Sequence, residues 1–420
     1  MIKSIRGTQD ILPGSVESWQ RIETTARRLF KLYGYGEVRT PILENTELFS
    51  RTIGTETDIV QKEMYSLAGS KGKTLSLRPE GTAPVVRAYL QHGLFNDGQI
   101  DKLYYIGPMF RRERPQKGRY RQFHQIGAEV LGSDHPAIEA EVIDMLSFFL
   151  QEVGFTSGQL LINSVGDSQC RPSYIKHLKK KIDTHLSEFC SDCRRRSDVN
   201  PLRVLDCKSP SCQPLIEQLP SILDHLCPEC CQHFDRFRHY LDLYGISYRV
   251  EPRLVRGLDY YIRTTFEMID ERIGPTQNAI LGGGRYDGLS ELLGGPNEKG
   301  FGFALGIERL ALLLSDEKKV VQNYQRSQPD IFLAYLDETS FEECFKIVRQ
   351  LRSQQIAAYL DFEPRSLKAQ MRLANRLKTR YVCVVGLNEI DSGTFSIKQM
   401  SDGSEVSVKL EEIAEHVKEK

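Results

Sequence analysis

The stretch that is most informative about the fold is a basic loop that reads Phe110-Arg111-Arg112-Glu113-Arg114-Pro115-Gln116-Lys117-Gly118-Arg119-Tyr120-Arg121. Six of these twelve residues are basic and one is acidic. Strand-like residues on both sides, 103–110 and 119–131, predict a hairpin with this loop at its turn. The planar guanidinium of Arg makes two parallel hydrogen bonds to phosphate, so the loop is a candidate phosphate site beside a sheet. A solvated surface hairpin explains the charge alone equally well.

The strand that follows the loop carries two polar residues, Gln125 and Glu129. They are separated by an even number of positions, so they face the same side of a strand. Buried polar side chains need hydrogen-bond partners, and a bound ligand could supply them. This face of the strand is therefore a candidate binding site.

Outward from the hairpin, apolar periodicity predicts the remaining elements. Helices are expected at 16–33, 83–92 and 136–153, and strands at 75–78, 247–251 and 260–269. The stretch from about 165 to 240 is charged, cysteine-rich and helical in pattern, which is typical of an insertion. After a polar linker, strands at 331–335 and 381–385 alternate with helices at 340–353 and 366–378, and this alternation predicts a small α/β domain.

Three further segments are candidates for ligand contact. Gly282-Gly283-Gly284 is expected to form a tight turn, and glycines also permit close approach of a ligand. Residues 303–314 are expected to form a helix behind a glycine-rich entry, with Arg309 in its first turn, where a phosphate could lie. Residues 254–261 bring Arg256 and two tyrosines together beside a glycine. An ordinary turn or an ion-paired structural arginine explains each segment taken alone.

The composition limits the class of protein. The chain has 420 residues with 40% hydrophobic and 27% charged, which is ordinary for globular chains. Lys+Arg and Asp+Glu both number 56, so a wholly basic nucleic-acid-coating protein is excluded, although local basic patches act over about 10 Å. No apolar run approaches the ~18 residues that span a bilayer, and the N-terminus lacks a secretory pattern. We expect a cytosolic protein without membrane contact, whose ten cysteines are thiols or metal ligands.

In this order, the segments resemble the histidine enzymes among the class II aminoacyl-tRNA synthetases. The likeness begins at Arg6-Gly7-Thr8-Gln9-Asp10-Ile11-Leu12-Pro13 and continues through Arg39-Thr40-Pro41-Ile42-Leu43-Glu44, Leu77-Arg78-Pro79-Glu80-Gly81-Thr82, the basic loop, 256–261, the triple glycine and 302–309. The resemblance implies an α+β catalytic domain at 1–325, an antiparallel sheet with flanking helices. It also implies a helical insertion at about 165–240 and a C-terminal α/β anticodon-binding domain at 329–420.

The resemblance also implies roles for single residues. The expected reaction joins histidine to ATP, releases pyrophosphate and then transfers histidine to tRNA, with Mg²⁺ bridging the ATP phosphates. The catalytic arginines would be Arg111 and Arg256 at the α-phosphate and Arg309 at the γ-phosphate. Glu113 and Phe123 would complete the ATP site by contacting adenine. The histidine site would comprise Glu80, Thr82, Gln125, Glu129, Tyr260 and Tyr261, with Glu129 accepting the imidazole N–H and Tyr261 donating to the other nitrogen.

Contacts with tRNA are expected in two places. The basic loop would meet the acceptor end through Arg114, Gln116, Lys117 and Arg119. The module at 329–420 would meet the anticodon, and Lys368, Arg372 and Arg376 share one face of its second helix. A solvated outer face explains that stripe equally well. The family also implies a homodimer whose interface includes the segment around Pro41.

The cysteine pattern predicts a structural zinc site. Cys190 and Cys193 form one C-x2-C pair, and Cys227 and Cys230 form another. Two such pairs can hold tetrahedral zinc. Reduced, partly buried thiols are the alternative reading of the same four residues.

Two other functions compete with the ligase. One is a synthetase-like, non-catalytic regulatory subunit of histidine biosynthesis, which would lack catalytic arginines and the anticodon module. The other is a tRNA sensor within a kinase, and no kinase motif accompanies the synthetase-like segments. Arg111, Arg256 and Arg309 are all present, as are residues 329–420. Histidine-dependent exchange of pyrophosphate into ATP separates the ligase from both.

Overall fold

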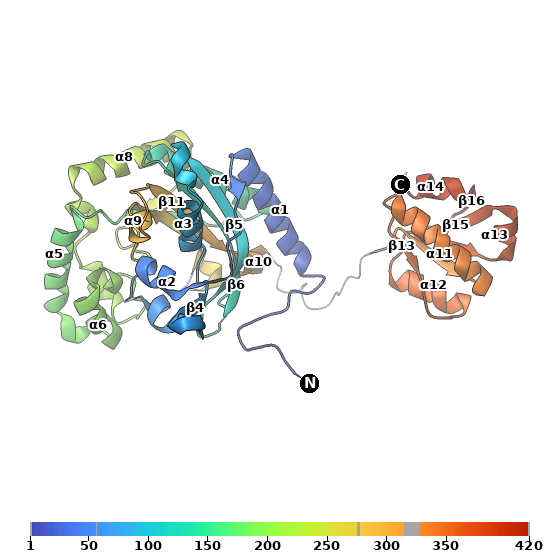
Figure 1. Ribbon diagram of the computed structural model, residues 1–420, viewed down its shortest axis with the longest axis horizontal. Helices are drawn as coiled ribbons and strands as arrows, with labels where there is room; N and C mark the ends of the chain where they lie inside the picture. The colour runs from blue at the N-terminus through green and yellow to red at the C-terminus, as the bar shows by residue number, and fades with distance from the viewer. Residues whose placement is uncertain (1, 56, 117, 275–277, 315–327, 419–420) are drawn as a thin grey trace. The chain divides into compact units, whose positions relative to one another are not determined.

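The computed structural model describes residues 2–55, 57–116, 118–274, 278–314 and 328–418. The chain divides into two compact units, Met1–Val321 and Gln322–Lys420. Figure 1 shows both units. None of the helices in the described ranges combines the length and the apolar character that a bilayer span requires.

The first unit is built on an eight-stranded sheet with the order β1-β5-β6-β11-β10-β9-β7-β8. Neighbouring strands are antiparallel except at the two edges, where β1 pairs with β5 and β7 with β8 in parallel. The expected antiparallel catalytic sheet is therefore confirmed. Its strands are β1 (Gly36–Glu37), β5 (Asp101–Phe110), β6 (Gln122–Leu131), β7 (Gln159–Ser164), β8 (Arg249–Val250), β9 (Ile262–Ile269), β10 (Ala279–Arg285) and β11 (Gly300–Gly306).

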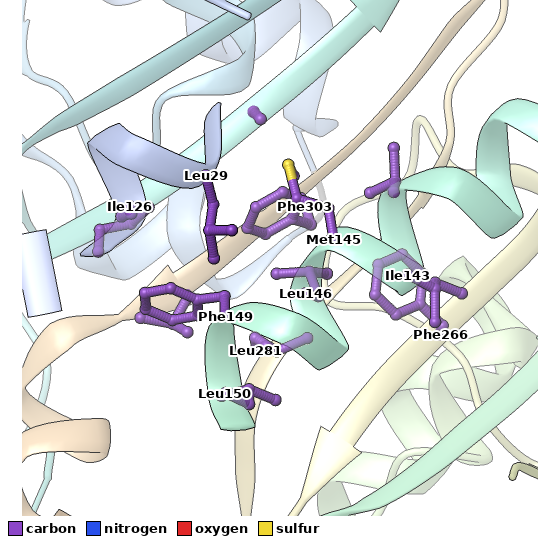
Figure 2. Packing of buried hydrophobic residues seen from close by; sticks show 14 of the residues in the cluster. Leu29, Ile126, Ile143, Met145, Leu146, Phe149, Leu150, Phe266, Leu281 and Phe303 are labelled. Carbon is purple, nitrogen blue, oxygen red and sulfur yellow. The ribbon is translucent and has the colours of Figure 1, made fainter. Parts of the chain in front are cut away.

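Helices α1 (Val16–Leu32), α4 (Pro136–Val153) and α10 (Ile307–Leu314) bury their apolar faces on this sheet. The buried residues of α1 recur at helical spacing, as the sequence predicted: Trp19, Ile22, Ala26, Leu29 and Phe30. Figure 2 shows side chains of α4 meeting Phe303 and Leu281 of the sheet. Helix α4 starts at Pro136 and ends before Gly154, whose φ of 91° only glycine adopts readily.

The two glycine-rich predictions were wrong in detail. Gly282, Gly283 and Gly284 lie within strand β10, not in a tight turn, and Phe303 lies in strand β11, so the helix begins only at Ile307. The physical reason is close packing between strands. A Cβ added at Gly283 would lie 2.1 Å from the carbonyl oxygen of Gly302, and one at Gly284 would lie 2.5 Å from that of Thr264. A run of glycines shows no alternation of apolar and polar side chains, so the sequence pattern did not indicate a strand.

A smaller sheet with the order β2-β4-β3 lies beside one short helix, and a second helix packs on that helix and on the large sheet. These elements are β2 (Leu43–Asn45), α2 (Thr46–Ile53), β3 (Tyr65–Ala68), β4 (Thr74–Leu77) and α3 (Thr82–Gln91). The insertion is helical, as expected, and has its own buried cluster around Tyr174, Leu178 and Ile182. Its helices are α5 (Arg171–Asp183), α6 (Ser191–Val199), α7 (Gln213–Glu217) and α8 (Pro228–Leu243), and α8 packs on α4. A short helix, α9 (Leu289–Leu292), follows β10.

The second unit has a five-stranded sheet with the order β13-β12-β14-β15-β16. The pairs β12·β13 and β12·β14 are parallel, and the other two pairs are antiparallel. All four elements expected here are present, and the α/β class is confirmed. The unit comprises β12 (Ile331–Tyr335), α11 (Glu338–Ser353), β13 (Ala358–Leu360), α12 (Leu367–Arg376), β14 (Tyr381–Val385), α13 (Leu387–Ser392), β15 (Thr394–Gln399), β16 (Glu405–Lys409) and α14 (Ile413–Lys418).

Candidate active site

One polar cavity gathers most of the predicted site residues. Its walls come from the start of α3, the basic loop after β5, strands β6, β10 and β11, the segment before β9 and the first turn of α10. These elements are distant in the chain but adjacent in the sheet order, so the fold brings the separate motifs together. The predicted residues that line the cavity are Glu80, Thr82, Arg111, Glu113, Arg119, Phe123, Gln125, Arg256, Tyr260, Tyr261 and Arg309.

Arg111 is fixed in the cavity wall by its backbone surroundings and by an aromatic ring. Its Nε donates a hydrogen bond to the carbonyl oxygen of Pro79 at 2.9 Å. Its guanidinium carbon lies 5.3 Å from the centroid of the Phe123 ring. Nη1 of Arg111 lies 3.8 Å from Glu113 Oε1, so the guanidinium keeps donors beyond the backbone bond that can contact an anion in the cavity.

Arg256 lies opposite a glycine that makes room for it. A Cβ added at Gly282 would stand 2.4 Å from the guanidinium of Arg256, so this member of the triple glycine is needed for the approach. The guanidinium pairs with Glu267 and lies 5.7 Å from the ring of Tyr261. Burial acts to lower the pKa of Arg256, but the charge of Glu267 outweighs it and raises that pKa. Arg256 therefore stays charged inside the wall.

Arg309, in the first turn of α10, is held by two backbone carbonyls, those of Gly118 and Ala279. Burial lowers the pKa of Arg309, and the positive charge of nearby Arg119 adds to this effect. Arg119 in turn forms an ion pair with Glu113 at 2.8 Å. Since burial and like charge both oppose the charged form of Arg309, an anion at this place would be strongly favoured.

Two buried carboxyl groups lie at another side of the cavity: Glu80 lines it, and Glu129 lies just behind its wall. The side chain of Glu80 accepts hydrogen bonds from the backbone N–H groups of Thr82 at 2.6 Å and Ala83 at 3.0 Å, which caps α3. Glu129 is fully buried and accepts from the hydroxyls of Thr82 at 2.7 Å and Tyr286 at 2.6 Å. Burial raises the pKa of Glu129 to about 8. Its partners are neutral hydroxyls, so its negative charge is not balanced by them.

The structure adds residues that the sequence did not identify. Tyr286 donates a hydrogen bond to Glu129; it lies two positions after the triple glycine, and no role was predicted for it. The ring of Tyr105 fills the space over Gly81 and Gly127, where added Cβ atoms would lie 2.2 and 2.3 Å from it. In sequence, Tyr105 looks like any core aromatic of a strand.

Gln125 Oε1 is buried and has no hydrogen-bond partner within the described part of the chain, which fits a site for a polar ligand.

The predicted tRNA-contacting residues differ in their exposure. Arg114 and Gln116 are exposed on the basic loop, while Lys117 lies outside the described residues. Arg119 differs from them because it lines the cavity and pairs with Glu113. In the second unit, Lys368, Arg372 and Arg376 of α12 are all exposed on one helix face.

The predicted four-cysteine metal site is corrected by the structure. Cys190 and Cys193 group with Cys207 and Cys212, whereas Cys227 and Cys230 group with Asp167 and Cys170. The two C-x2-C pairs therefore belong to different clusters. Spacing in the sequence shows which thiols share a helix end, but it does not show which helix ends meet in the fold.

Comparisons with known proteins agree with this geometry. A protein-family model described as histidyl-tRNA synthetase matches residues 7–310, and one described as an anticodon binding domain matches residues 330–420. The histidine–tRNA ligase of Syntrophotalea carbinolica is 48% identical over 419 residues, covering 100% of this chain and 99% of that protein. The histidine–tRNA ligase of Geobacter metallireducens is 49% identical over 414 residues, covering 99% of this chain and 98% of that protein.

A solved structure gives the same answer for the fold. The crystal structure of the apo histidyl-tRNA synthetase of S. aureus superposes with a TM-score of 0.81 and 38% identity, covering 99% of this chain and 100% of that one. A structure titled as an ATP phosphoribosyltransferase regulatory subunit/histidyl-tRNA synthetase from Bacillus halodurans matches with a TM-score of 0.66 and 20% identity, over 92% of this chain and 99% of that one. At this low identity the second likeness shows the fold alone.

Proposed function

Because this chain belongs to the histidyl-tRNA synthetase family and is a histidine–tRNA ligase, we propose that its polar cavity is where histidine reacts with ATP. The observation that carries the proposal is the arrangement of charge in one cavity. Arg111, Arg256 and Arg309 converge on it from three separate segments. The buried carboxyl group of Glu80 lines another part of it, and that of Glu129 lies behind this part, one hydrogen bond from Thr82. Cations suit a triphosphate, and an unbalanced carboxyl suits an imidazole N–H.

The arginines would act on the phosphates. In the activation step, a carboxylate oxygen of histidine attacks the α-phosphorus, the bond to the bridging oxygen breaks, and pyrophosphate leaves. Negative charge builds on the α-phosphate, and fixed cations stabilise it there. We assign this role to Arg111 and Arg256, and we assign the γ-phosphate to Arg309. Phe123, whose ring lies beside the guanidinium of Arg111, would lie against the adenine ring. Glu113 would accept a hydrogen bond from the adenine amino group.

Magnesium would be held mainly by the nucleotide. Bound Mg²⁺ would neutralise part of the phosphate charge during transfer. The carboxylates that line the cavity are already engaged: Glu113 pairs with Arg119, Glu80 accepts from the N–H groups of Thr82 and Ala83, and Glu308 accepts from the N–H of His124. The phosphates and water would therefore supply most of its ligands, which suits an ion that keeps several waters.

The carboxyl part of the cavity would select histidine. Neutral imidazole offers one N–H donor and one acceptor. Glu129 would accept the N–H, and Tyr261 would donate to the other nitrogen. Glu80, Thr82, Gln125 and Tyr260 would hold the amino group and backbone. A wrong amino acid would leave these buried polar groups unpaired, which discriminates by ~10⁴ or more.

Two regions would contact tRNA. On the basic loop, Arg114 and Lys117 would neutralise acceptor-end phosphates, and Gln116 would reach base edges. Arg119, whose guanidinium pairs with Glu113, would approach the acceptor end from the cavity side. The domain at 329–420, with the exposed stripe of α12, would bind the anticodon, and the domain at 1–325 would contain the whole activation site.

Assembly and location follow from the family. We propose a homodimer whose interface includes the segment around Pro41. In support, Ile42 and Leu43 are exposed there, each with 42% of its surface accessible. The measured mass in solution tests this. We propose the cytoplasm as the location, in keeping with ten cysteines that are all free in the structure.

The test of the proposed function separates activation from transfer. Histidine-dependent exchange of pyrophosphate into ATP is expected for the full chain and should largely survive deletion of 329–420. Charging of tRNA should fall strongly in the same deletion, because the anticodon contact is lost. A full chain that binds tRNA without exchanging pyrophosphate would instead support the regulatory alternative.

A further inference from the structure

Seven cysteines and one aspartate of the insertion and its flanks gather at two separate places. In the first cluster, the Sγ atoms of Cys190, Cys193, Cys207 and Cys212 all lie within 4.8 Å of one another. Cys190 and Cys207 are 3.8 Å apart, which is too far for a disulfide. A tetrahedral zinc ion with Zn–S bonds of about 2.3 Å holds its sulfurs about 3.8 Å apart. The first cluster therefore has the dimensions of a Cys₄ zinc site before any ion is added.

The second cluster has a mixed ligand set. Asp167, Cys170, Cys227 and Cys230 also place one ligand atom each within 4.8 Å of the others. Cys170 Sγ lies 3.9 Å from Cys230 Sγ and 3.6 Å from Asp167 Oδ1, which is also 3.8 Å from Cys227 Sγ. The other carboxylate oxygen, Oδ2, lies 3.5 Å from the guanidinium of Arg263. One oxygen thus faces the thiols while the second faces a compensating cation, as an outer-shell partner of a metal ligand does.

Local structure prepares these side chains for a metal. Cys190 and Cys227 are the N-caps of α6 and α8, and the second cysteine of each pair lies in the first helical turn. A helix N-terminus favours a thiolate. Backbone N–H groups also point at the sulfurs: that of Cys190 donates to Cys212 Sγ at 3.3 Å, and that of Asp167 donates to Cys170 Sγ at 3.3 Å. Donors aimed at sulfur stabilise thiolates that bind metal.

Both clusters are tied to the segment that carries Arg256 and Tyr261. Between Cys193 and Cys207, the side chain of Asn200 donates to Asp259 at 3.1 Å, and Arg203 donates to the carbonyl of Gly257 at 2.6 Å. Next to the second cluster, Arg171 donates to the carbonyl of Tyr261.

Backbone bonds add a second tie at the same place. The N–H of Val165 donates to the carbonyl of Arg263 at 2.7 Å, and the N–H of Arg263 donates to that of Gly166 at 2.8 Å. The residues that lead into Asp167 and Cys170 are therefore bonded directly to the start of β9. A change at either cluster would be passed to the residues beside the cavity.

We propose that the insertion holds two zinc ions, one in the Cys190–Cys193–Cys207–Cys212 site and one in the Asp167–Cys170–Cys227–Cys230 site, and that together they fix the 256–261 segment. Cysteine-rich tetrahedral sets select zinc, and sulfur atoms grouped this closely surround one ion each. The metal sites are independent of the roles proposed above. The positioning of 256–261 rests on the proposed roles of Arg256 and Tyr261.

The first test measures metal in the full-length protein, purified in reducing buffer without chelator. Elemental analysis is expected to find two equivalents of zinc and no iron. Cys212→Ser and Cys170→Ser should each retain one equivalent. Cys231→Ser is the matched control, because this exposed thiol follows Cys230 directly yet belongs to neither cluster, and it should retain two. Wild-type protein with one equivalent or none, or either cluster variant losing all metal, would overturn the two-site proposal.

A second measurement does not depend on the variants folding. Wild-type protein stripped of zinc and titrated with Co²⁺ should show thiolate-to-cobalt absorption that saturates at two equivalents, and saturation at one would overturn the proposal. Stripped protein should also bind histidine more weakly, by ~5-fold or more, with restoration on adding zinc. Unchanged histidine affinity would overturn the positioning role. Failure of the proposed catalytic function would appear differently, as zinc-replete protein that exchanges no pyrophosphate.

Discussion

Two buried carboxyl groups of the catalytic unit, Glu129 on β6 and Glu139 on α4, have opposite surroundings. Both are completely inaccessible to solvent. Glu139 accepts hydrogen bonds from Arg285 at 2.6 Å and interacts with His233 at 2.9 Å. Burial acts to raise the pKa of Glu139, but the charges of Arg285 and His233 outweigh it and lower that pKa to about 2. Glu129 has only hydroxyl partners, and burial raises its pKa to about 8.

The difference indicates that Glu139 stabilises the fold, whereas Glu129 is available to bind a ligand. Glu139 is neutralised within the protein, so nothing further is needed to keep it buried. Glu129 lies one hydrogen bond from Thr82 of the cavity wall, and no cation of the protein pairs with it in the described ranges. Burying a carboxylate without compensation is unfavourable, so a donor supplied by a ligand is the natural partner. Variants of these two groups test the contrast, and the half-way case is the pair Arg256–Glu267 beside the cavity.

The largest effect is expected on the free energy of unfolding, when Glu139 loses its ion-pair partner Arg285. Arg285→Ala would leave Glu139 buried with His233 as its remaining close partner. Removing one member of a buried pair lowers the free energy of unfolding by roughly 3–5 kcal/mol. Denaturant unfolding can be followed by the fluorescence of Trp19, the single tryptophan, which lies in the core of this unit.

Replacing both members is the control for that experiment. Glu139→Met combined with Arg285→Met removes both charges, and it should recover much of the lost stability because apolar residues of similar volume replace the pair. If Arg285→Ala unfolds at the same denaturant concentration as the wild type, the pair does not stabilise the fold and the contrast with Glu129 fails.

The second effect concerns a charged pair that faces the cavity. Arg256 and Glu267 keep 18% and 20% of their side-chain surface exposed, whereas Arg285 and Glu139 keep none, so Arg256→Ala should cost less stability than Arg285→Ala. It should slow adenylate formation by about 10²–10³-fold, by analogy with loss of one oxyanion-hole donor. Single-turnover formation of histidyl-adenylate measures this. Arg249→Ala is the control, since this exposed arginine pairs with Glu251 outside the cavity wall. A rate near that of the wild type for Arg256→Ala would remove it from the α-phosphate.

The third effect is on substrate affinity. Glu129→Gln should weaken histidine binding by roughly 1.5–3 kcal/mol, because the imidazole N–H loses a charged acceptor, while ATP binding stays nearly constant. Calorimetric titration with each substrate measures the two affinities. Tyr286→Phe, which keeps the carboxyl but removes one hydroxyl partner, should have a smaller effect of the same sign. Equal weakening of histidine and ATP would move Glu129 out of the histidine pocket.

The sequence predicted those parts of the fold in which apolar periodicity is regular and the site residues stand in short recognisable segments. Strands β5, β6, β8 and β9 of the large sheet, the insertion and the C-terminal unit were predicted, because their apolar patterns are regular, and the site arginines stand in contiguous charged or glycine-rich segments. Strand β7 was not predicted. Strands β10 and β11 were not recognisable as strands, since their glycines exist to let backbones approach.

The site was less predictable where residues act in pairs that are distant in sequence. Arg285 and Glu139 look like surface charges until the fold joins them across 146 positions. Tyr286 gained its role only from its bond to Glu129, 157 positions away. The cysteines were grouped wrongly for the same reason, since spacing identifies helix ends but not their neighbours.

The smallest expected effect is the release of a proton when histidine binds. With a pKa of about 8, Glu129 is mostly protonated near neutral pH in the free enzyme, and an imidazole N–H that donates to it would favour the ionised form. Histidine binding at about pH 7 should therefore release close to one proton, and binding at about pH 9 should release almost none. Calorimetry in two buffers with different ionisation enthalpies measures this number, and Glu129→Gln should abolish the release.

Stability of the free enzyme should depend on pH in the matching direction. The folded-state pKa of Glu129 is raised, so its contribution to stability is fully present below its unfolded value of about 4.3 and is lost as pH rises towards about 8. Glu139 works in the opposite sense: its pKa is lowered to about 2, so its contribution is present above about 4.3 and is lost as pH falls through about 2. Between about pH 4.3 and about pH 8, the unfolding midpoint should decline less steeply with rising pH in Glu129→Gln than in the wild type. Identical slopes in the two proteins would mean that Glu129 is ionised in the free enzyme, and its carboxylate would then need a compensating partner that the cavity does not show in the described residues.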